Sequence, residues 1–316
     1  MSRKTAAKTP ERRPKRDVDG ILLLDKPTGI TSNRALQIAK RIFKARKAGH
    51  TGSLDPLACG MLPLCFGNAT KVSGLLLDSD KAYEVRMQIG SRTDTADADG
   101  EIVETADTDE IPEAQLLASM TRFTGEHDQV PPMYSALKQD GQRLYKLARE
   151  GIEVERKARR IAIRELRIVE YHPSRPRLFV RCSKGTYIRS LVEDIARDAG
   201  TLAHVLELRR VWVEPFTTQT MVSLEELETL AEQGDAALDG LLIGADQALL
   251  HLPELHFADE GVEGLLNGRQ EQPLGNPGNP GSCRMYAESG VFLGLGELLE
   301  SGLVAPKRIF AVKPQK

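Results

Sequence analysis

The chain has 316 residues, of which 41% are hydrophobic, and its 43 Lys and Arg nearly balance 45 Asp and Glu. This composition fits a globular protein with a sizeable core, and at roughly 150 residues per domain the length suggests about two domains. No stretch offers the roughly 20 apolar residues of a membrane span, and no apolar segment of a secretory signal follows the basic start. We therefore expect a cytoplasmic protein.

Positive charge is concentrated at the N-terminus. The first seventeen residues contain seven Lys and Arg against only Glu11 and Asp17. Such a segment has little to bury, so residues 1–18 are predicted to be a basic, disordered arm that favours contact with phosphates. A solubilising tail without further function is the open alternative.

The next segment combines a strand with a helix. Residues 20–24 form a short apolar run that predicts a buried strand. Thr31 or Ser32 can cap a helix that runs to about Arg46. The basic residues at its end exceed what the helix dipole needs, so a phosphate-facing surface and a solvated face both remain open.

Alternating side chains predict a half-buried strand at residues 81–90. Glu84, Arg86 and Gln88 share one face, and the apolar side chains between them share the other. Similar patterns predict strands at 161–168, with a bulge where the alternation slips, and at 178–182, a helix at 187–198, and a capping box of Ser223 and Glu226 at the start of a further helix.

The order of these elements indicates the fold class. Strands and helices mix without a regular βαβ alternation, so residues 19–250 are expected to form an α+β domain with a mixed, mostly antiparallel sheet and flanking helices. Residues 130–152 are predicted to be an exposed, basic excursion from this domain. Beyond residue 250, short apolar stretches alternate with Gly/Pro turns, which predicts a small, mainly β domain at 251–316.

Familiar cofactor and metal motifs are incomplete. The acidic turn at residues 97–100 fails as an EF-hand loop because its first and last positions would be Thr95 and Ala106 instead of carboxylates. No P-loop, dinucleotide fingerprint or nucleophile elbow is complete. Neither the six histidines nor the four cysteines show metal-ligand spacing, and no disulfide framework is expected. We therefore expect no metal or cofactor, and any chemistry must come from ordinary side chains.

Asp55 is the carboxylate with the most distinctive surroundings. It stands in the segment Gly-His-Thr-Gly-Ser-Leu-Asp-Pro at residues 49–56. Pro56 restricts Asp55 to extended geometry, so the carboxylate is held on a stiff loop. Neighbouring Leu and Met side chains would leave it poorly solvated unless another group pairs with it. Taken alone, an Asp-Pro turn with a structural carboxylate explains this segment equally well.

This segment is accompanied by several others. Residues 49–63 (GHTGSLDPLACGMLP) closely resemble the signature segment of the TruB family of tRNA pseudouridine synthases. The resemblance implies a pseudouridine synthase fold, a thumb-like RNA-binding insertion at about 130–152, and a PUA-like RNA-binding domain at 251–316. Cys59 departs from the small hydroxyl residue that related sequences often carry. Further segments are similar to family motifs in family order: 25–32 (DKPTGITS), 78–83 (DSDKAY), 133–138 (MYSALK), 182–189 (CSKGTYIR) and 203–210 (AHVLELRR).

The resemblance also implies an activity, namely the isomerisation of uridine to pseudouridine at position 55 in the T-loop of tRNA. By position, Asp55 is the catalytic carboxylate, acting as a nucleophile at C1′ or as a base at C2′. Arg189 is then the partner that would keep Asp55 ionised, and Tyr83 the catalytic residue that stacks on the target base. The residues implied to bind the substrate are His50, Tyr83, Tyr187 and Leu208.

The expected partner is the T-arm stem-loop of tRNA, whose target base must flip out to reach Asp55. We expect a monomer that needs no protein partner and no membrane. A tRNA-folding chaperone with secondary catalysis is an alternative function. A glycoside hydrolase that releases uracil from RNA is another, although such enzymes usually use two carboxylates.

Overall fold

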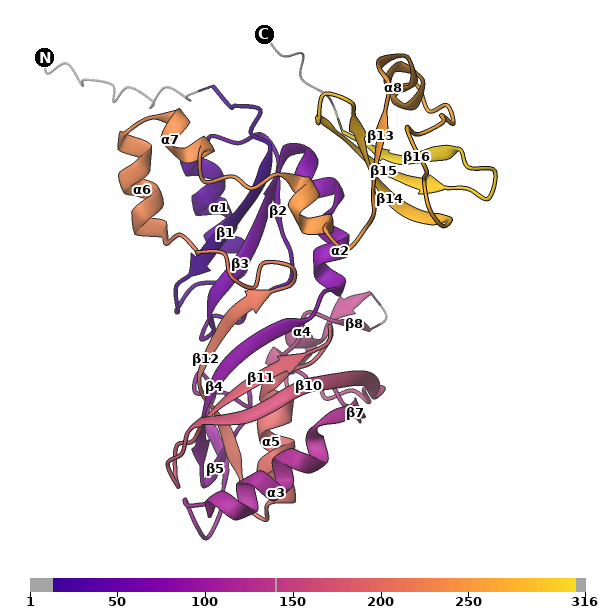
Figure 1. Ribbon diagram of the computed structural model, residues 1–316. Helices are drawn as coiled ribbons and strands as arrows, with labels where there is room; N and C mark the ends of the chain where they lie inside the picture. Colours follow the sequence, from indigo (N-terminus) through magenta and orange to yellow (C-terminus); the bar gives the residue numbers. More distant parts are fainter. Residues whose placement is uncertain (1–13, 140, 311–316) are drawn as a thin grey trace, which may run out of the picture.

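The computed structural model describes residues 14–139 and 141–310 (Figure 1). An eight-stranded sheet runs through most of the molecule, and its strands pair antiparallel except for β3 with β12. The predicted α+β fold with a mixed, mostly antiparallel sheet is thereby confirmed. Across the sheet lie β1 (Gly20–Lys26), β3 (Cys59–Phe66), β12 (Ala203–Val213), β4 (Lys81–Ile89), β11 (Arg177–Cys182), β10 (Arg159–Glu170) and β7 (Gly125–Gln129), with β2 (Ala48–His50) also paired to β3.

The half of the sheet around β1 and β3 is covered on both faces. Alternate residues of β1 enter different cores: Leu22 and Leu24 join the larger one, while Ile21 and Leu23 join a second one. The helices that supply the larger core on this side are α1 (Ser32–Ile42), α6 (Leu224–Glu232) and α7 (Asp235–Asp239). The second core is closed by η1 (Gly67–Lys71), α2 (Ser73–Asp78) and η2 (Ala245–Leu249).

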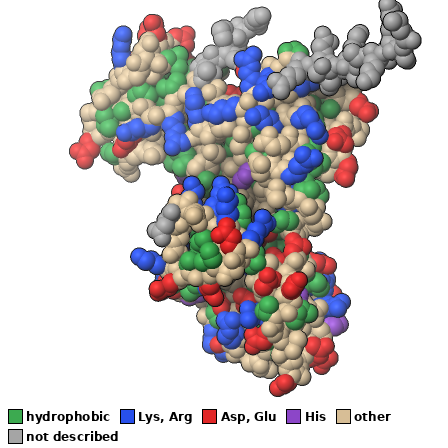
Figure 2. All heavy atoms as spheres, turned by 180° about the vertical axis from the view of Figure 1, so that it is seen from behind, with side chains coloured by type: hydrophobic (Ala, Val, Ile, Leu, Met, Phe, Trp, Pro, Cys, Tyr) green, Lys and Arg blue, Asp and Glu red, His purple; other side chains and the backbone are tan. Residues whose placement is uncertain are grey.

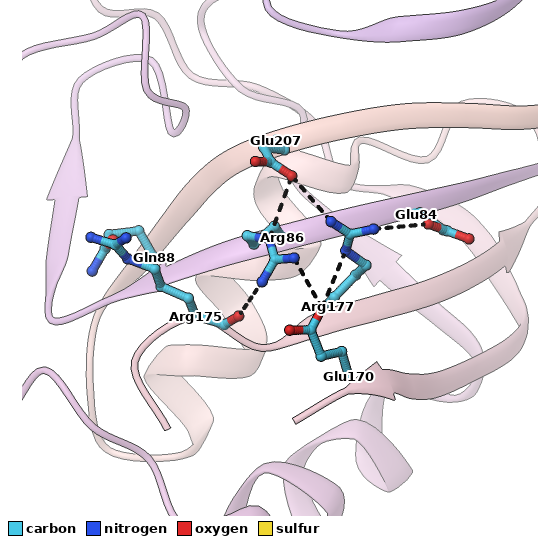
Figure 3. Close-up of polar contacts among 7 residues, drawn as sticks. All are labelled: Glu84, Arg86, Gln88, Glu170, Arg175, Arg177 and Glu207. Atoms are coloured by element: carbon cyan, nitrogen blue, oxygen red, sulfur yellow. Dashed lines mark hydrogen bonds and ion pairs between the residues drawn. The ribbon is translucent and has the colours of Figure 1, made fainter. Parts of the chain in front are cut away.

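The other half of the sheet has only one covered face. Here α5 (Ile188–Asp198) and α3 (Glu113–Phe123) pack against the apolar side chains of β4, β10 and β11. The predicted alternation along β4 is confirmed, since Tyr83, Val85 and Met87 are buried in the larger core. The opposite face carries a network of arginines and glutamates that includes Arg86 and Glu84 (Figure 3). We call these the inner face and the outer face.

Most local predictions hold, with one correction. The Ser223–Glu226 capping box is present, and the register of β10 shifts at the expected bulge. However, α1 ends at Ile42 and not near Arg46. Lys44 has a left-handed φ of 53°, a conformation that cannot continue a right-handed helix. The last cations of that segment therefore lie on a loop.

Residues 14–18, the described part of the expected N-terminal arm, contact the folded body. Residues 1–13 lie outside the described residues. Val18 is buried in the larger core, and Arg16 forms ion pairs with Asp235 and Asp239 of α7. Residues 14–18 thus pack on the folded body, because Val18 supplies an apolar anchor that a count of charges overlooks.

Smaller elements surround the main sheet. Residues 251–310 contain a separate four-stranded sheet, which confirms the expectation of a mainly β C-terminal region. Among the described residues, no helix has the length and apolar character needed to cross a membrane. The C-terminal elements are β13 (Glu254–Phe257), α8 (Asp259–Leu266), β14 (Gly281–Ala287), β15 (Phe292–Leu298) and β16 (Val304–Ile309). The ribbon of β5 (Ser91–Thr93) and β6 (Ile102–Thr105) follows β4, and the 130–152 excursion contains β8 (Lys138–Gln139), β9 (Gln142–Arg143) and α4 (Leu144–Arg149).

Candidate active site

Asp55 lies on the loop between β2 and β3, in the irregular segment that Pro56 was expected to impose. The start of α1 supports this loop, because the Leu54 amide donates to the Ser32 hydroxyl at 2.7 Å. Lys26 stiffens the adjoining turn by donating to two of its carbonyl oxygens at 2.6 and 2.8 Å. Burial lowers the pKa of Lys26 to about 8. The strand, turn and helix that open the domain therefore act as a rigid support for the carboxylate.

Arg189 reaches Asp55 from the first turn of α5. Its Nη2 lies 3.0 Å from the Asp55 Oδ2, and its side chain is only 5% exposed. The same guanidinium donates to the carbonyl oxygens of Thr95 and Tyr134, both at 2.7 Å. Arg189 thus joins the Asp55 loop to the ribbon after β4 and to the start of the 130–152 excursion.

Asp97 is a second carboxylate near Arg189 that sequence reasoning missed. Its Oδ2 lies 3.7 Å from the Arg189 Nη1, and it is buried. The Thr95 hydroxyl donates to its Oδ1 at 2.6 Å. The acidic turn at 97–100 was tested only as a calcium loop, and no local pattern connects it with residue 189. Only the fold shows that one guanidinium lies between two carboxylates.

The pKa of Asp55 is shifted upward. Although 43% of its side chain is exposed, the carboxyl is packed closely enough for burial to raise its pKa. Arg189 provides the strongest opposing effect, whereas the negative charge of Asp97 adds to the rise. Arg189 therefore acts in the expected direction without outweighing burial. Asp55 is therefore harder to ionise than a free carboxyl group, although part of its side chain remains open to solvent.

Two tyrosines lie close enough to Asp55 for its charge to affect them. Tyr83 is buried on the inner face of β4, and Tyr187 directly precedes α5. Burial raises the pKa of both phenols, and the Asp55 charge adds to the rise. The Gln129 side chain fixes the backbone of Tyr187 through hydrogen bonds of 2.8 and 3.0 Å. The structure thus gathers Asp55, Arg189 and both tyrosines.

His50 and Leu208 flank this group. His50 ends β2, and its buried Nδ1 has no hydrogen-bond partner among the described residues. Burial and the charge of Arg210 lower the pKa of His50, which favours a neutral ring. Leu208 is buried opposite Val85 and lines a cavity of about 600 Å³ together with Leu57. Among the described residues, neither side chain forms a hydrogen bond or ion pair with Asp55.

A sizeable hollow lies next to this group. It has a volume of about 1000 Å³ and is lined by Thr95, Tyr134 and Ser190 beside Arg189, without including Asp55. The described residues also contain no cluster of three or more His, Cys, Asp or Glu side chains that could hold a metal ion.

Comparison with known proteins places this geometry in a family. Residues 40–188 match the model of the TruB family pseudouridylate synthase N-terminal domain. Residues 189–250 match the tRNA pseudouridylate synthase B C-terminal domain, and residues 253–310 match the C-terminal domain of pseudouridine synthase II TruB.

Curated relatives span nearly the whole chain. The tRNA pseudouridine synthase B of Pseudomonas fluorescens is 50% identical, over 94% of this chain and 97% of its own. That of Nitrosococcus oceani is 48% identical, over 93% and 95%. The fold is similar to a solved structure of an H/ACA RNP bound to a substrate RNA containing 2′-deoxyuridine, with a TM-score of 0.71, 22% identity, and coverage of 99% of this chain and 96% of that chain. The chain belongs to the TruB family of pseudouridylate synthases.

Proposed function

We propose that the protein isomerises uridine to pseudouridine at position 55, in the T-loop of tRNA, with Asp55 as the catalytic carboxylate. The observation that carries this proposal is the 3.0 Å ion pair between Asp55 and the buried Arg189. The names of the curated relatives, tRNA pseudouridine synthase B, support tRNA as the substrate.

In the proposed reaction, a reactive carboxylate does the chemistry without a cofactor. The N1–C1′ bond breaks, the base rotates, and a C5–C1′ bond forms while the proton lost from C5 is balanced by one gained at N1. Asp55 can begin this as a nucleophile at C1′ or as a base at C2′, and both routes need the ionised carboxylate. Its raised pKa makes it more basic, while Arg189 stabilises the charge. Tyr83 would stack on the flipped base, with His50, Tyr187 and Leu208 around the nucleotide.

Phosphate contacts would offset the few kcal/mol needed to flip the base. Figure 2 shows Lys and Arg side chains gathered on one face of the upper part of the molecule. This part includes the basic residues in and after α1, among them Lys40, Arg41 and Lys47. The 130–152 excursion and the C-terminal sheet are the other candidate RNA contacts.

Site-resolved pseudouridine mapping tests the proposal directly. The wild-type protein is incubated with an unmodified T-arm stem-loop, and Asp55→Asn serves as the matched variant. We expect conversion of one uridine at unchanged RNA mass, and no conversion by the variant, which still binds the RNA. Absence of product with the wild type would refute the enzyme, and release of free uracil would favour a glycoside hydrolase. If Asp55→Asn still promotes tRNA folding, chaperone activity accompanies catalysis.

A further inference from the structure

Arg210 is a buried cation beside the candidate site that the mechanism above does not use. It lies on β12, is only 1% exposed, and is among the largest fully buried side chains of the described chain. None of the ion pairs found among the described residues includes its guanidinium, whereas Arg189 pairs with two carboxylates. A buried charge without a carboxylate partner is costly unless hydrogen bonds satisfy it. The groups that accept hydrogen bonds from Arg210 therefore show which parts of the structure it stabilises.

Two of these partners are the ends of the loop that carries Asp55. The Arg210 Nε donates to the Met61 carbonyl oxygen at 2.6 Å, and its Nη2 donates to the Gly52 carbonyl oxygen at 3.2 Å. Gly52 precedes Asp55 and Met61 follows it on β3. A single rigid fork therefore spans the base of the catalytic loop.

The backbone holds Arg210 tightly in this place. Arg210 pairs with Gly60 on the parallel strand β3. A Cβ on Gly60 would lie 2.2 Å from the Arg210 carbonyl oxygen, so the close approach of β3 and β12 requires glycine here. The close contact of the two strands fixes the position of Arg210 relative to the Asp55 loop.

Tyr83 is the third partner of Arg210. The two residues are opposite each other in the antiparallel pairing of β4 with β12. Across this pairing, the charge of the guanidinium opposes the burial that raises the Tyr83 pKa. One side chain thus binds both ends of the Asp55 loop and lies across the strand pair from the tyrosine expected to meet the base.

We propose that Arg210 is a positioning residue that holds the Tyr83 hydroxyl in a fixed place relative to the Asp55 loop. This inference rests on the proposed function, and it adds a link between the carboxylate that acts on the ribose and the phenol that faces the base. Arg210 itself touches neither Asp55 nor, in this proposal, the substrate.

Arg86 offers a matched control, because it projects from β4 toward β12 on the outer face, whereas Arg210 projects from β12 toward β4 on the inner face. Its partners are Glu170 at 3.0 Å and Glu207 at 3.4 Å, both exposed (Figure 3). Arg→Lys at either position keeps the charge and removes the planar fork. Only the change at Arg210 should alter the geometry around Tyr83.

The test measures kcat and the Kd for a T-arm RNA in Arg210→Lys and Arg86→Lys. We expect Arg210→Lys to lower kcat by roughly tenfold, as for the loss of one charged hydrogen bond, with Kd changed by less than about twofold. Arg86→Lys should leave both values unchanged. Thermal melts report folding, and Arg210→Gln is the second variant if Arg210→Lys does not fold.

A double-mutant cycle with Tyr83→Phe separates positioning from general stability. If Arg210 acts through the hydroxyl, Arg210→Lys should cost less than about threefold in the Tyr83→Phe background. Additive losses, a loss confined to Kd, a wild-type kcat in Arg210→Lys, or unfolding of both Arg210 variants would overturn the inference. Absence of product with the wild-type protein would instead overturn the proposed function and this inference with it.

Discussion

The inner and outer faces of β4 and its neighbours carry the same kinds of charged residues in different surroundings. On the outer face, Arg86 and Arg177 share Glu170 and Glu207, and Arg177 also pairs with Glu84, at 3.0 to 3.9 Å (Figure 3). On the inner face, Arg189 holds Asp55 at 3.0 Å beneath α5. Arg189 is only 5% exposed, against 17% for Arg86 and 33% for Arg177, and burial on the inner face raises the pKa of Asp55.

The distances in the two ion-pair groups are similar, so distance alone does not explain the shifted pKa of Asp55. The burial of the inner pair does. Exposed pairs contribute only about 0–1 kcal/mol, because water and salt screen them. On the inner face, burial raises the pKa of Asp55 against the attraction of Arg189, and such perturbation is typical of functional sites. The outer network therefore keeps an uncovered sheet face soluble, while the inner one can do chemistry.

The largest expected effect is the loss of the inner carboxylate. Asp55→Asn should lower kcat by about a thousandfold or more, because neither route to pseudouridine can begin without this carboxylate. The Kd for a T-arm RNA should stay nearly constant, as measured by filter binding. Glu207→Gln, which removes an outer-face carboxylate, is the control and should keep wild-type kcat. If Asp55→Asn and Glu207→Gln had equal kcat, the inner and outer carboxylates would not differ in function.

Arg189→Lys should have the next largest effect, a fall in kcat of about a hundredfold. Lysine keeps the charge but cannot hold Asp55 and the carbonyl oxygens of Thr95 and Tyr134 with one planar group. Single-turnover kinetics measure the change. Arg197→Lys, near the exposed end of the same helix, should be silent. A silent Arg189→Lys would mean that charge alone suffices at this position.

The raised pKa of Asp55 predicts a smaller, pH-dependent effect. A carboxyl whose pKa is raised in the folded state binds its proton more tightly there than in the unfolded chain. Its contribution therefore destabilises the fold as pH rises from the ordinary value of 3.8 through the raised value. Asn cannot titrate, so the stability of Asp55→Asn relative to wild type should increase over this window and then level off. Activity should fall with decreasing pH at a pH above 3.8.

Denaturant melts from acidic to neutral pH measure the first expectation, and a pH profile of kcat/KM measures the second. Asp128→Asn, which removes an exposed carboxylate, controls for a general effect of charge. A stability difference between Asp55→Asn and wild type that does not change with pH would contradict the raised pKa.

The smallest effect is expected on the outer face. Arg86→Gln should change the free energy of unfolding by less than about 1 kcal/mol and leave kcat unchanged. The adjacent Met87 faces inward and is fully buried, so Met87→Ala should cost about 2–5 kcal/mol. Urea denaturation of both variants measures the contrast. Similar losses in the two would show that the outer network contributes more than its exposure suggests.

Much of the fold was predictable, because its signals are local. Alternation along β4, the bulge in β10 and the Ser223–Glu226 capping box depend on neighbouring residues and were correctly predicted. The end of α1 was predicted wrongly, since the left-handed turn at Lys44 leaves no clear mark in the sequence. Burial of Val18 was also missed, because the core that it joins is assembled from segments far apart in the sequence.

The candidate site divides in the same way. The sequence by itself determined that Asp55 sits before a proline on a stiff loop, and its motifs identified Arg189, Tyr83 and the family. Only the tertiary structure brought Asp97 to the far side of Arg189 and placed Arg210 beneath the loop. Those contacts join strands and turns that are distant in sequence, and their strength depends on burial. A local sequence pattern does not show which distant residues will meet or whether water will be excluded around them. The charges and pKa shifts of this site are therefore decided only when the sheet forms.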